Sequence, residues 1–392
     1  MPVDAYFRTA GITALMGMTA LTGTMAAADQ DWPGRALERS RATHLGLPAV
    51  PAGRGSAAMV ALGRKIFFDR RLSFNGTISC GMCHVPEQAF ANNEMATAVG
   101  FEGRTVKRNA PTLINVALLG PLFHDGRESA LETQFIGPLV AVNEMANPSV
   151  GRVVELLRTL PDYRGRFEQA FGHGVSLDAI GASLAEYQRT LVAGSSRFDR
   201  WRYGNEVGAL TADEQRGLAL FTGKAGCVQC HTIGERDALL TDQRFHDTGY
   251  GWWREQLRQR PEAGEAIEVA PGVRYRLGRE VIASVSAAAI ADLGRYEATL
   301  DPRDLWKFRT PSLRNVALTA PYMHDGGLRT LAEVVAFYDG GGKPHQGQSP
   351  LVRPLGLDAG EREALVAFLA TLTSEGLDDL VGEARSAPPD NW

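Results

Sequence analysis

The sequence is poor in cysteine, has no block of like charges and contains only one long apolar run. Four of its 392 residues are cysteines, and its net charge at pH 7 is −4. Without a basic block the chain offers no electrostatic basis for binding nucleic acid, and without an acidic tail it has no charged segment of the disordered kind. Its length is enough for two domains of ordinary size.

The long apolar run covers residues 10–28. It is rich in small residues, follows Arg8 and ends in three alanines, which is typical of a secretory signal peptide cleaved after Ala28. An uncleaved membrane anchor is the alternative, because the run is just long enough to span a bilayer. No other stretch of the sequence could cross a membrane. We therefore expect a signal peptide at residues 1–28, a mature protein in the periplasm and no membrane span after cleavage.

All of the cysteines fall in two copies of one motif, Cys-x-x-Cys-His. In each copy two thiols lie three positions apart, and a histidine follows at once. Covalent attachment of haem c needs this arrangement, because each thiol adds to one vinyl group of the haem and the histidine ligates the iron. The residues are Cys80, Cys83 and His84 in the first copy and Cys227, Cys230 and His231 in the second.

Two other uses of a Cys-x-x-Cys pair must be weighed. Two such pairs can form a zinc ribbon. Alternatively, each pair can form a local disulfide or a thioredoxin-like redox site. None of these uses explains why a histidine follows both pairs directly. The sequence therefore favours two covalently bound haem c groups.

Helical patterns precede both motifs. Apolar residues recur at helical spacing over residues 57–68, and Thr211 with Glu214 forms a capping box ahead of the second motif. The insertion at residues 234–304 has no readable pattern, and the tail from residue 386 is expected to be loose. The predicted fold class is mainly α, with long irregular loops packed on haem. Further helices are expected at residues 150–160, 161–171, 177–191 and 358–372.

A second repeat follows each haem motif. It contains Pro-x-Leu-x-Asn-Val-Ala-Leu, at residues 108–118 and again at residues 309–318, and each copy is followed by a His-Asp-Gly turn. Two matches in the same order after both motifs indicate a duplicated domain. We expect two tandem cytochrome c-like domains, the first at residues 29–200 and the second at residues 201–392.

With these motifs in place, the chain resembles the bacterial di-haem cytochrome c peroxidase and MauG superfamily over residues 57–373. The resemblance implies that the N-terminal haem reacts with hydrogen peroxide and that the C-terminal haem holds or relays the second oxidising equivalent. His84 and His231 would be the proximal iron ligands. Glu144 matches the distal glutamate of the family, and Gln134 matches its distal glutamine.

The implied role of Glu144 is proton transfer. Cleavage of a bound peroxide needs a base that takes the proton of the inner oxygen and returns it to the departing outer oxygen. A carboxylate whose pKa is raised by an apolar pocket can do both. On the residues alone, a solvated loop glutamate is the alternative.

Two positions resemble MauG more than the peroxidases that oxidise small cytochromes. Those peroxidases usually carry a histidine in the loop before the first Asn-Ala-Pro, where this chain has Phe101. Phenylalanine cannot ligate iron, so the first haem is expected to be five-coordinate and ready for peroxide. Tyr338 matches the tyrosine that ligates the second haem in MauG, and an oxygen donor lowers the haem potential where a thioether raises it. Otherwise Tyr338 is a core aromatic residue, with Met323 or no side chain as the sixth ligand.

The chain departs from the family at His124, where a tryptophan usually stands between the haems. We expect His124 to hydrogen-bond a propionate or a backbone group, and His324 and His246 to be structural as well. The resemblance also implies a calcium ion between the domains, which suits hard oxygen donors. Its implied ligands are the side chain of Asn109 and the backbone carbonyls of Thr319 and Pro321.

The function implied by the resemblance is that of a haem peroxidase-type oxidoreductase that uses hydrogen peroxide to oxidise residues of a periplasmic partner protein, as the MauG and MbnH types do. A di-haem cytochrome c peroxidase that takes electrons from a small cytochrome c or cupredoxin is the first alternative. A non-catalytic di-haem electron carrier is the second. Oxidising equivalents would leave through surface aromatic residues, for which the candidates are Trp252, Trp253 and Trp306.

Overall fold

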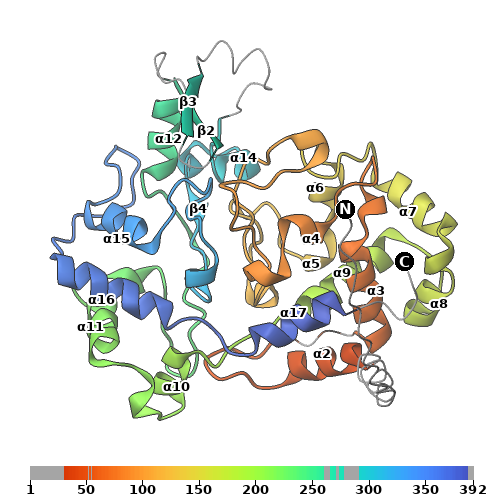
Figure 1. The fold of residues 1–392 in the computed structure, drawn as a ribbon, viewed down its shortest axis with the longest axis horizontal. Coiled ribbons are helices and arrows are strands. Elements are labelled where there is room, and N and C mark those ends of the chain that lie inside the picture. The colour runs from red at the N-terminus through yellow and green to blue at the C-terminus, as the bar shows by residue number, and fades with distance from the viewer. Residues whose placement is uncertain are drawn as a thin grey trace, which may run out of the picture.

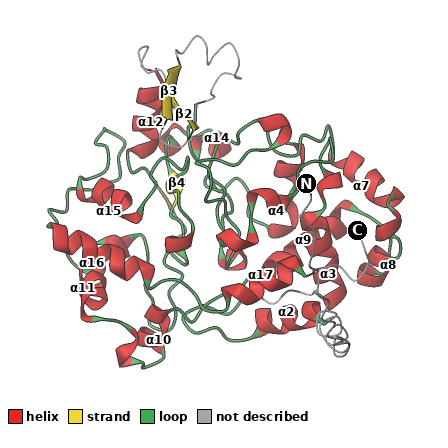
Figure 2. Cartoon of the chain, in the orientation of Figure 1, coloured by secondary structure: helices red, strands yellow, loops and turns green. Residues whose placement is uncertain are grey.

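The computed structural model describes residues 31–51, 53, 55–259, 265–270, 273–277 and 291–386. The predicted signal peptide and the end of the predicted loose tail lie outside these residues. Within them the chain is mainly helical, with long loops between the helices and few strands (Figure 2). The predicted fold class is thereby confirmed. None of the helices in the described ranges is long and apolar enough to span a bilayer.

The N-terminal half is built on a pair of packed helices, α3 (Ala57–Phe68) and α9 (Leu177–Arg189). Gly63 allows their close approach, because a Cβ atom at this position would lie 1.9 Å from the Ser183 carbonyl oxygen. The pair buries apolar side chains in one core with the helices around it. Among the members of this core are Val60, Leu62, Ile66, Phe67, Ile180 and Leu184.

The C-terminal half repeats this pair with α11 (Ala212–Thr222) and α16 (Ala359–Ala370). Here Gly217 provides the close approach, because a Cβ atom would lie 2.0 Å from the Ala364 carbonyl oxygen. The predicted capping box before α11 is present. A separate core forms around this pair. Among its members are Phe198, Phe221, Leu240, Leu365, Phe368 and Leu372.

The loops after the haem motifs are duplicated as well. Asn115 and Asn315, at matching places in the repeat, both adopt the left-handed conformation, with φ of 65° and 60°. The side-chain oxygen of Asn115 accepts a hydrogen bond from the Ala193 backbone at 3.0 Å, and that of Asn315 accepts one from the Ser374 backbone at 2.7 Å. The repeated sequence therefore produces the same turn and the same anchor twice.

The remaining helices lie around these two cores. A predicted helix at residues 161–171 is interrupted: a short 3-10 turn at Pro161–Tyr163 is followed by Gly165 with φ of 78°, and the α-helix begins after it. The other helices are α2 (Trp32–Arg41), α4 (Cys80–Cys83), α5 (Leu131–Gln134), α6 (Ile136–Val140), α7 (Val150–Thr159), α8 (Arg166–Phe171), α10 (Arg197–Tyr203), α12 (Tyr250–Gln259), α14 (Tyr296–Thr299), α15 (Leu331–Asp339) and α17 (Leu377–Arg385).

The insertion at residues 234–304, whose fold could not be predicted from the sequence, contains most of the strands among the described residues. β1 (Phe245–His246) pairs antiparallel with β4 (Phe308–Arg309). β2 (Glu265–Ala270) pairs antiparallel with β3 (Val273–Leu277), and this hairpin lies beside α12 at the top of the view in Figure 1. The described end of the insertion also contacts the N-terminal half, where Asp292 pairs with Arg108 at 2.7 Å.

The last described helix packs against the half in which the chain begins. Helix α17 crosses to the N-terminal half, where it lies near α2 and α3 (Figure 1), and its Leu380 and Ala384 are part of the first core. Glu383 pairs with Arg39 at 2.6 Å, which adds a link between the two ends of the described chain. The predicted domain limits remain a prediction, and α17 belongs by its packing to the first half.

Candidate haem sites

The first Cys-x-x-Cys-His motif lies on α4 and the residue after it. His84 Nδ1 lies 3.1 Å from the backbone carbonyl oxygen of Phe90. Because a carbonyl can only accept, Nδ1 carries the proton and Nε2 offers its lone pair. Burial lowers the pKa of His84, which keeps the imidazole neutral. Histidine binds a metal as a neutral ring whose Nδ1–H donates a hydrogen bond to the protein.

The second motif is arranged in the same way. Cys227 begins a short 3-10 turn, and His231 follows it directly with its Nδ1 2.9 Å from the Leu240 carbonyl oxygen. Burial lowers the pKa of His231 too. Both motifs therefore present a histidine whose lowered pKa favours the neutral ring and whose Nδ1 faces a backbone carbonyl.

The motif thiols are partly buried and unpaired. The two pairs pack against different cores, Cys80 against the first and Cys227 against the second, which disfavours a zinc ribbon shared by both pairs. Burial raises the pKa of all four thiols above the ordinary value, whereas thiols of redox sites have a lowered pKa. The pKa is raised to about 12 for Cys80 and to about 11 for Cys83, Cys227 and Cys230.

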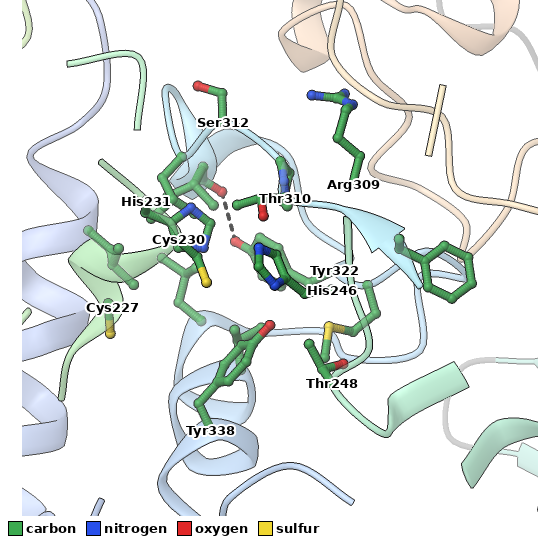
Figure 3. Close-up of a pocket in the computed structure, with 18 of the residues that line it drawn as sticks. Cys227, Cys230, His231, His246, Thr248, Arg309, Thr310, Ser312, Tyr322 and Tyr338 are labelled. Carbon is green, nitrogen blue, oxygen red and sulfur yellow. Dashed lines mark hydrogen bonds between the residues drawn. The ribbon is translucent and has the colours of Figure 1, made fainter. Parts of the chain in front are cut away.

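A cavity of about 320 Å³ lies next to the second motif. Cys227, Cys230 and His231 line it from one segment, and Tyr338 lines it from α15 (Figure 3). The volume is within the range of about 300–1,000 Å³ for sites that hold small molecules and cofactors. The cavity thus brings the attachment cysteines and the two predicted axial ligands around one space.

An unpaired cation in this cavity fits the carboxylates of a haem. Arg309 lines the cavity and donates from Nε to the Phe123 carbonyl oxygen at 3.1 Å. Its Nη1 is buried and finds no hydrogen-bond partner among the described residues. Burial lowers the pKa of Arg309 to about 10. Since a buried charge without a partner is costly, an anionic group fits this place, and a propionate of a bound haem would supply one.

The predicted sixth ligand of the second haem, Tyr338, is on α15. This helix begins with a capping box made by Thr330 and Glu333. Burial raises the pKa of Tyr338, so that its phenol is protonated in the cavity. Met323 lines the same cavity. The assignment of Tyr338 as a ligand therefore stays a prediction, with Met323 as the alternative that the sequence already offered.

The predicted distal glutamate lies near the first motif. Burial raises the pKa of Glu144, and Arg127 partly offsets the effect. The Glu144 carboxylate in turn raises the pKa of Cys80 and Cys83, which places it within electrostatic reach of both. Gln134 ends α5 and is half-buried. The structure therefore brings Glu144 to the first haem motif, while the roles of Glu144 and Gln134 stay predictions.

Phe101, which stands at the family's histidine position, packs beside this glutamate. Its backbone N–H donates to the Glu144 carbonyl oxygen at 3.0 Å. Its side chain is buried, and its ring contacts Phe74 edge-on with a centroid distance of 6.0 Å. The loop therefore approaches the first haem motif with an apolar side chain that cannot ligate a metal.

The three histidines expected to be structural all have protein partners. A ring nitrogen of His124 lies 2.9 Å from the Asn109 carbonyl oxygen, which is the predicted bond to a backbone group, and burial lowers the pKa of His124 to about 4. His324 stacks on Phe308 with a centroid distance of 3.9 Å. His246 Nε2 lies 2.8 Å from an Asp242 carboxylate oxygen.

His246 and Asp242 also form a compact group with Cys230, whose possible ligand atoms all lie within 4.8 Å of one another. Haem attachment would use the sulfur of Cys230 and would leave only His246 and Asp242 of this group to bind a metal. The implied calcium ligands Asn109, Thr319 and Pro321 line the same cavity as His231. They offer hard oxygen donors, and the calcium ion stays a prediction.

Sequence reasoning missed several groups that shape these sites. The carbonyls of Phe90 and Leu240, which orient the proximal histidines, carry no sequence signal because any residue has a backbone carbonyl. Arg309 could have been found, since it opens the second copy of the repeat.

Comparisons with known proteins agree with this geometry. A family model described as di-haem cytochrome c peroxidase matches residues 57–207. The chain is 38% identical over 335 residues to cytochrome-c peroxidase IdrP1 of Denitromonas iodatirespirans, covering 83% of this chain and 85% of that protein. It is 37% identical over 358 residues to methylamine utilization protein MauG of Methylorubrum extorquens, covering 91% of this chain and 89% of that protein.

Solved structures give the same result. The crystal structure of a MauG-like protein associated with microbial copper homeostasis has a TM-score of 0.67 and 31% identity, covering 86% of this chain and 97% of that chain. The diheme peroxidase BthA from Burkholderia thailandensis E264 has a TM-score of 0.66 and 25% identity, covering 84% of this chain and 89% of that chain.

Proposed function

Because this chain belongs to the di-haem cytochrome c peroxidase family, which includes MauG, we propose that it uses hydrogen peroxide to oxidise residues of a partner protein. Membership makes it a haem-dependent oxidoreductase with two haem c groups. It also implies hydrogen peroxide and either a protein partner or an electron donor as reactants. The proposal concerns the finer choice between these roles.

The observation that carries the proposal is the phenol of Tyr338 in the cavity of the second haem motif. An oxygen donor at iron lowers the potential, which suits a haem that stores an oxidising equivalent better than one that accepts electrons from a cytochrome. The apolar Phe101 beside Glu144 supports the same choice, because it leaves the first haem without a capping histidine.

Different residues of the chain have different roles in the proposed reaction. When bound, the haems would supply the iron chemistry that links oxidation of the partner to reduction of peroxide. His84 and His231 would hold the two irons through Nε2, with their Nδ1 atoms bonded to backbone carbonyls. Glu144, with its raised pKa, takes the proton of the inner peroxide oxygen and returns it to the outer oxygen, which leaves as water. Gln134 assists by hydrogen bonding to the peroxide.

A cytochrome c peroxidase activity is the second candidate. It is favoured by the 38% identity to cytochrome-c peroxidase IdrP1, which is as high as the identity to MauG. In this role the same site would reduce peroxide with electrons from a small cytochrome c or a cupredoxin. Glu144 would act in the same way, and only the source of the electrons would differ.

The test is a spectroscopic titration of the purified ferric protein. Absorption and EPR spectra are recorded before and after one equivalent of hydrogen peroxide, and reduced cytochrome c or reduced azurin is then added. We expect a spectral change without prior reduction and slow turnover with either donor. Fast steady-state turnover would establish the peroxidase role instead. An unchanged spectrum with two six-coordinate haems would leave a non-catalytic electron carrier.

The proposal also includes a calcium ion and a periplasmic location. Asn109, Thr319 and Pro321 are the proposed ligands, supported by their placement around one cavity. Metal analysis of the purified protein before and after treatment with EGTA tests this site, and protein without calcium would contradict it. The apolar residues 10–28 support export, which fractionation of expressing cells tests directly.

A further inference from the structure

We infer that Tyr250 and Trp253, both on α12, carry single electrons from the protein surface to the cavity of the second haem motif. The inference rests on the proposed peroxide-dependent function and adds the place where a partner delivers its electrons. It holds for either kind of partner, since a protein substrate and a small redox donor both supply electrons one at a time.

A continuous line of ring contacts connects the cavity with α12. The rings of Tyr338 and Phe337 have a centroid distance of 5.1 Å, those of Phe337 and Tyr250 a distance of 5.6 Å, and those of Tyr250 and Trp253 also 5.6 Å. All three distances are within the range of about 4.5–7 Å for aromatic contacts. The line starts at the proposed haem ligand and ends at a half-buried indole.

Tyr250 has the proton acceptor that an oxidisable tyrosine needs. A phenol that loses an electron also loses its proton, and the hydroxyl of Tyr250 donates to the Asp325 carboxylate at 3.0 Å. Arg254 Nε donates to the other oxygen of that carboxylate at 2.6 Å, which fixes its orientation. Gly327 makes room for this contact, because a Cβ atom there would lie 2.0 Å from the Tyr250 hydroxyl oxygen.

The matching aspartate of the first repeat is used differently. Asp125 is paired with Arg108 at 2.6 Å and with Arg127 at 3.1 Å. Two arginines thus occupy this carboxylate, whereas Asp325 accepts from a tyrosine. The phenol–carboxylate contact is therefore a feature of the second half and not a by-product of the duplicated turn.

The ring contacts also select one of the three candidate tryptophans. Trp252 stacks on His345 with a centroid distance of 4.9 Å, and Trp306 contacts the same imidazole edge-on at 5.7 Å. Trp253 instead contacts Tyr250, and the ammonium of Lys343 lies 4.7 Å from the centre of its indole ring. This cation disfavours the oxidised indole, so a hole on Trp253 is readily filled from outside.

The transfer balances as follows. A partner gives one electron to Trp253, and Trp253 gives one to Tyr250. Tyr250 in turn gives one electron across Phe337 to the Tyr338 side of the cavity. Tyr250 releases its phenolic proton to Asp325 when it is oxidised and takes the proton back when Trp253 reduces it. Two such electrons and two protons convert one hydrogen peroxide into two water molecules. Phe337 is not itself oxidised and provides only contact.

The test uses the full-length di-haem protein, treated with hydrogen peroxide in the absence of any partner or donor. Peptide mass spectrometry then measures oxidation of each tryptophan, and EPR detects a tyrosine radical. We expect Trp253 to be the most oxidised tryptophan. Tyr250→Phe keeps the ring packing and should lower this oxidation about tenfold or more, which corresponds to a barrier higher by about 1.4 kcal/mol.

Two matched variants test whether the effect is specific to the Tyr250 hydroxyl and whether the charge of Lys343 matters. Tyr203→Phe removes another tyrosine hydroxyl of the same half, which donates to the Gly234 carbonyl oxygen at 3.1 Å, and should leave oxidation of Trp253 unchanged. Lys343→Met removes the charge above the indole while keeping a long side chain, and should increase oxidation of Trp253. Absorption spectra of the ferric proteins show whether each variant still holds both haems.

The outcomes separate the relay from the proposed function. Equal oxidation of Trp253 in the Tyr250→Phe and unmodified proteins, with peroxide consumed in both, would overturn the relay. Absence of any peroxide consumption by the unmodified protein would overturn the relay and the proposed function together. Oxidation of Trp253 that depends on Tyr250, combined with fast turnover of reduced cytochrome c, would support the relay and overturn oxidation of a protein substrate.

Discussion

His84 and His231 are held in nearly the same way, whereas the groups brought to the two motifs from later in the chain differ. Each histidine places Nδ1 against a backbone carbonyl, at 3.1 Å in the first half and 2.9 Å in the second. The first motif lies near the carboxyl of Glu144, and the second shares a cavity with the phenol of Tyr338. The two halves thus share the arrangement that orients the motif histidine and differ in the polar group that lies near it.

The same contrast appears at matching positions of the repeat. Ile114 is buried in the apolar core of the first half. Arg314, its counterpart, is buried and forms an ion pair with the buried Asp199, with Nη2 2.9 Å from Oδ1. Its Nε also donates to the Ala238 carbonyl oxygen at 2.9 Å. The second half therefore depends on a buried charge pair where the first depends on packing.

The largest expected effect comes from replacing Arg314 by isoleucine, the residue that the first half has at the matching position. Arg314→Ile leaves Asp199 as a buried charge without its partner, which should lower the free energy of unfolding by about 3–5 kcal/mol. Urea denaturation followed by circular dichroism measures the change. Arg303→Ala, at an exposed arginine on the surface, is the control and should have little effect. If Arg314→Ile were as stable as the unmodified protein, the buried pair would not hold the second half together.

The next largest effect is expected from removing the proposed proton acceptor of the first haem site. Glu144→Gln removes the proton acceptor and should slow the reaction with peroxide by about 10²-fold or more. In the unmodified protein the rate should fall as the pH drops below the raised pKa of Glu144, because the protonated carboxyl cannot act as a base, and the variant should lose this dependence. Stopped-flow absorbance measures both.

Glu102→Gln is the matched control for this variant. Glu102 lies in the Phe101 loop, and its carboxylate is exposed and pairs with Arg104 at 3.3 Å. Its substitution should leave the peroxide rate unchanged. An unmodified rate in Glu144→Gln would mean that another group accepts the proton.

The corresponding change at the second site is Tyr338→Phe. It should alter the absorption and EPR signals of the second haem alone, because the proposed ligand is lost while the proximal histidine remains. Tyr322→Phe removes a hydroxyl from the same cavity, where it donates to the Val316 carbonyl oxygen at 3.0 Å, and should leave the ligation unchanged. Identical spectra for Tyr338→Phe and the unmodified protein would favour Met323 or no side chain as the sixth ligand.

The smallest expected effect compares the N-caps of the two matching helices. Ser56 caps α3 through its side chain alone, whereas Thr211 and Glu214 cap α11 reciprocally. Replacing either cap residue by alanine should lower the free energy of unfolding by about 1 kcal/mol, with Thr211→Ala the costlier because it breaks the reciprocal box. Urea denaturation of the two variants measures the order, and a larger loss for Ser56→Ala would contradict it.

The sequence predicted the parts of the fold that depend on local pattern. The helices at residues 57–68 and 177–191 and the capping box before α11 were found from spacing alone, because their signals lie within a few turns. The helix predicted at residues 161–171 was only partly right, since Gly165 takes a left-handed conformation that interrupts it. Within the insertion, β1 could not be predicted because it is two residues long and pairs with β4, a partner distant in the sequence.

By itself the sequence predicted two attached haems and the residues that attach them, because thioether attachment requires only neighbouring cysteines and a histidine. Tertiary structure decided what surrounds them. Arg309 lines the second cavity, and Tyr250 lies between Phe337 and Asp325, yet none of these residues is near a haem motif in the chain. Contacts of this kind arise when separate helices and loops pack together, and no local spacing encodes them.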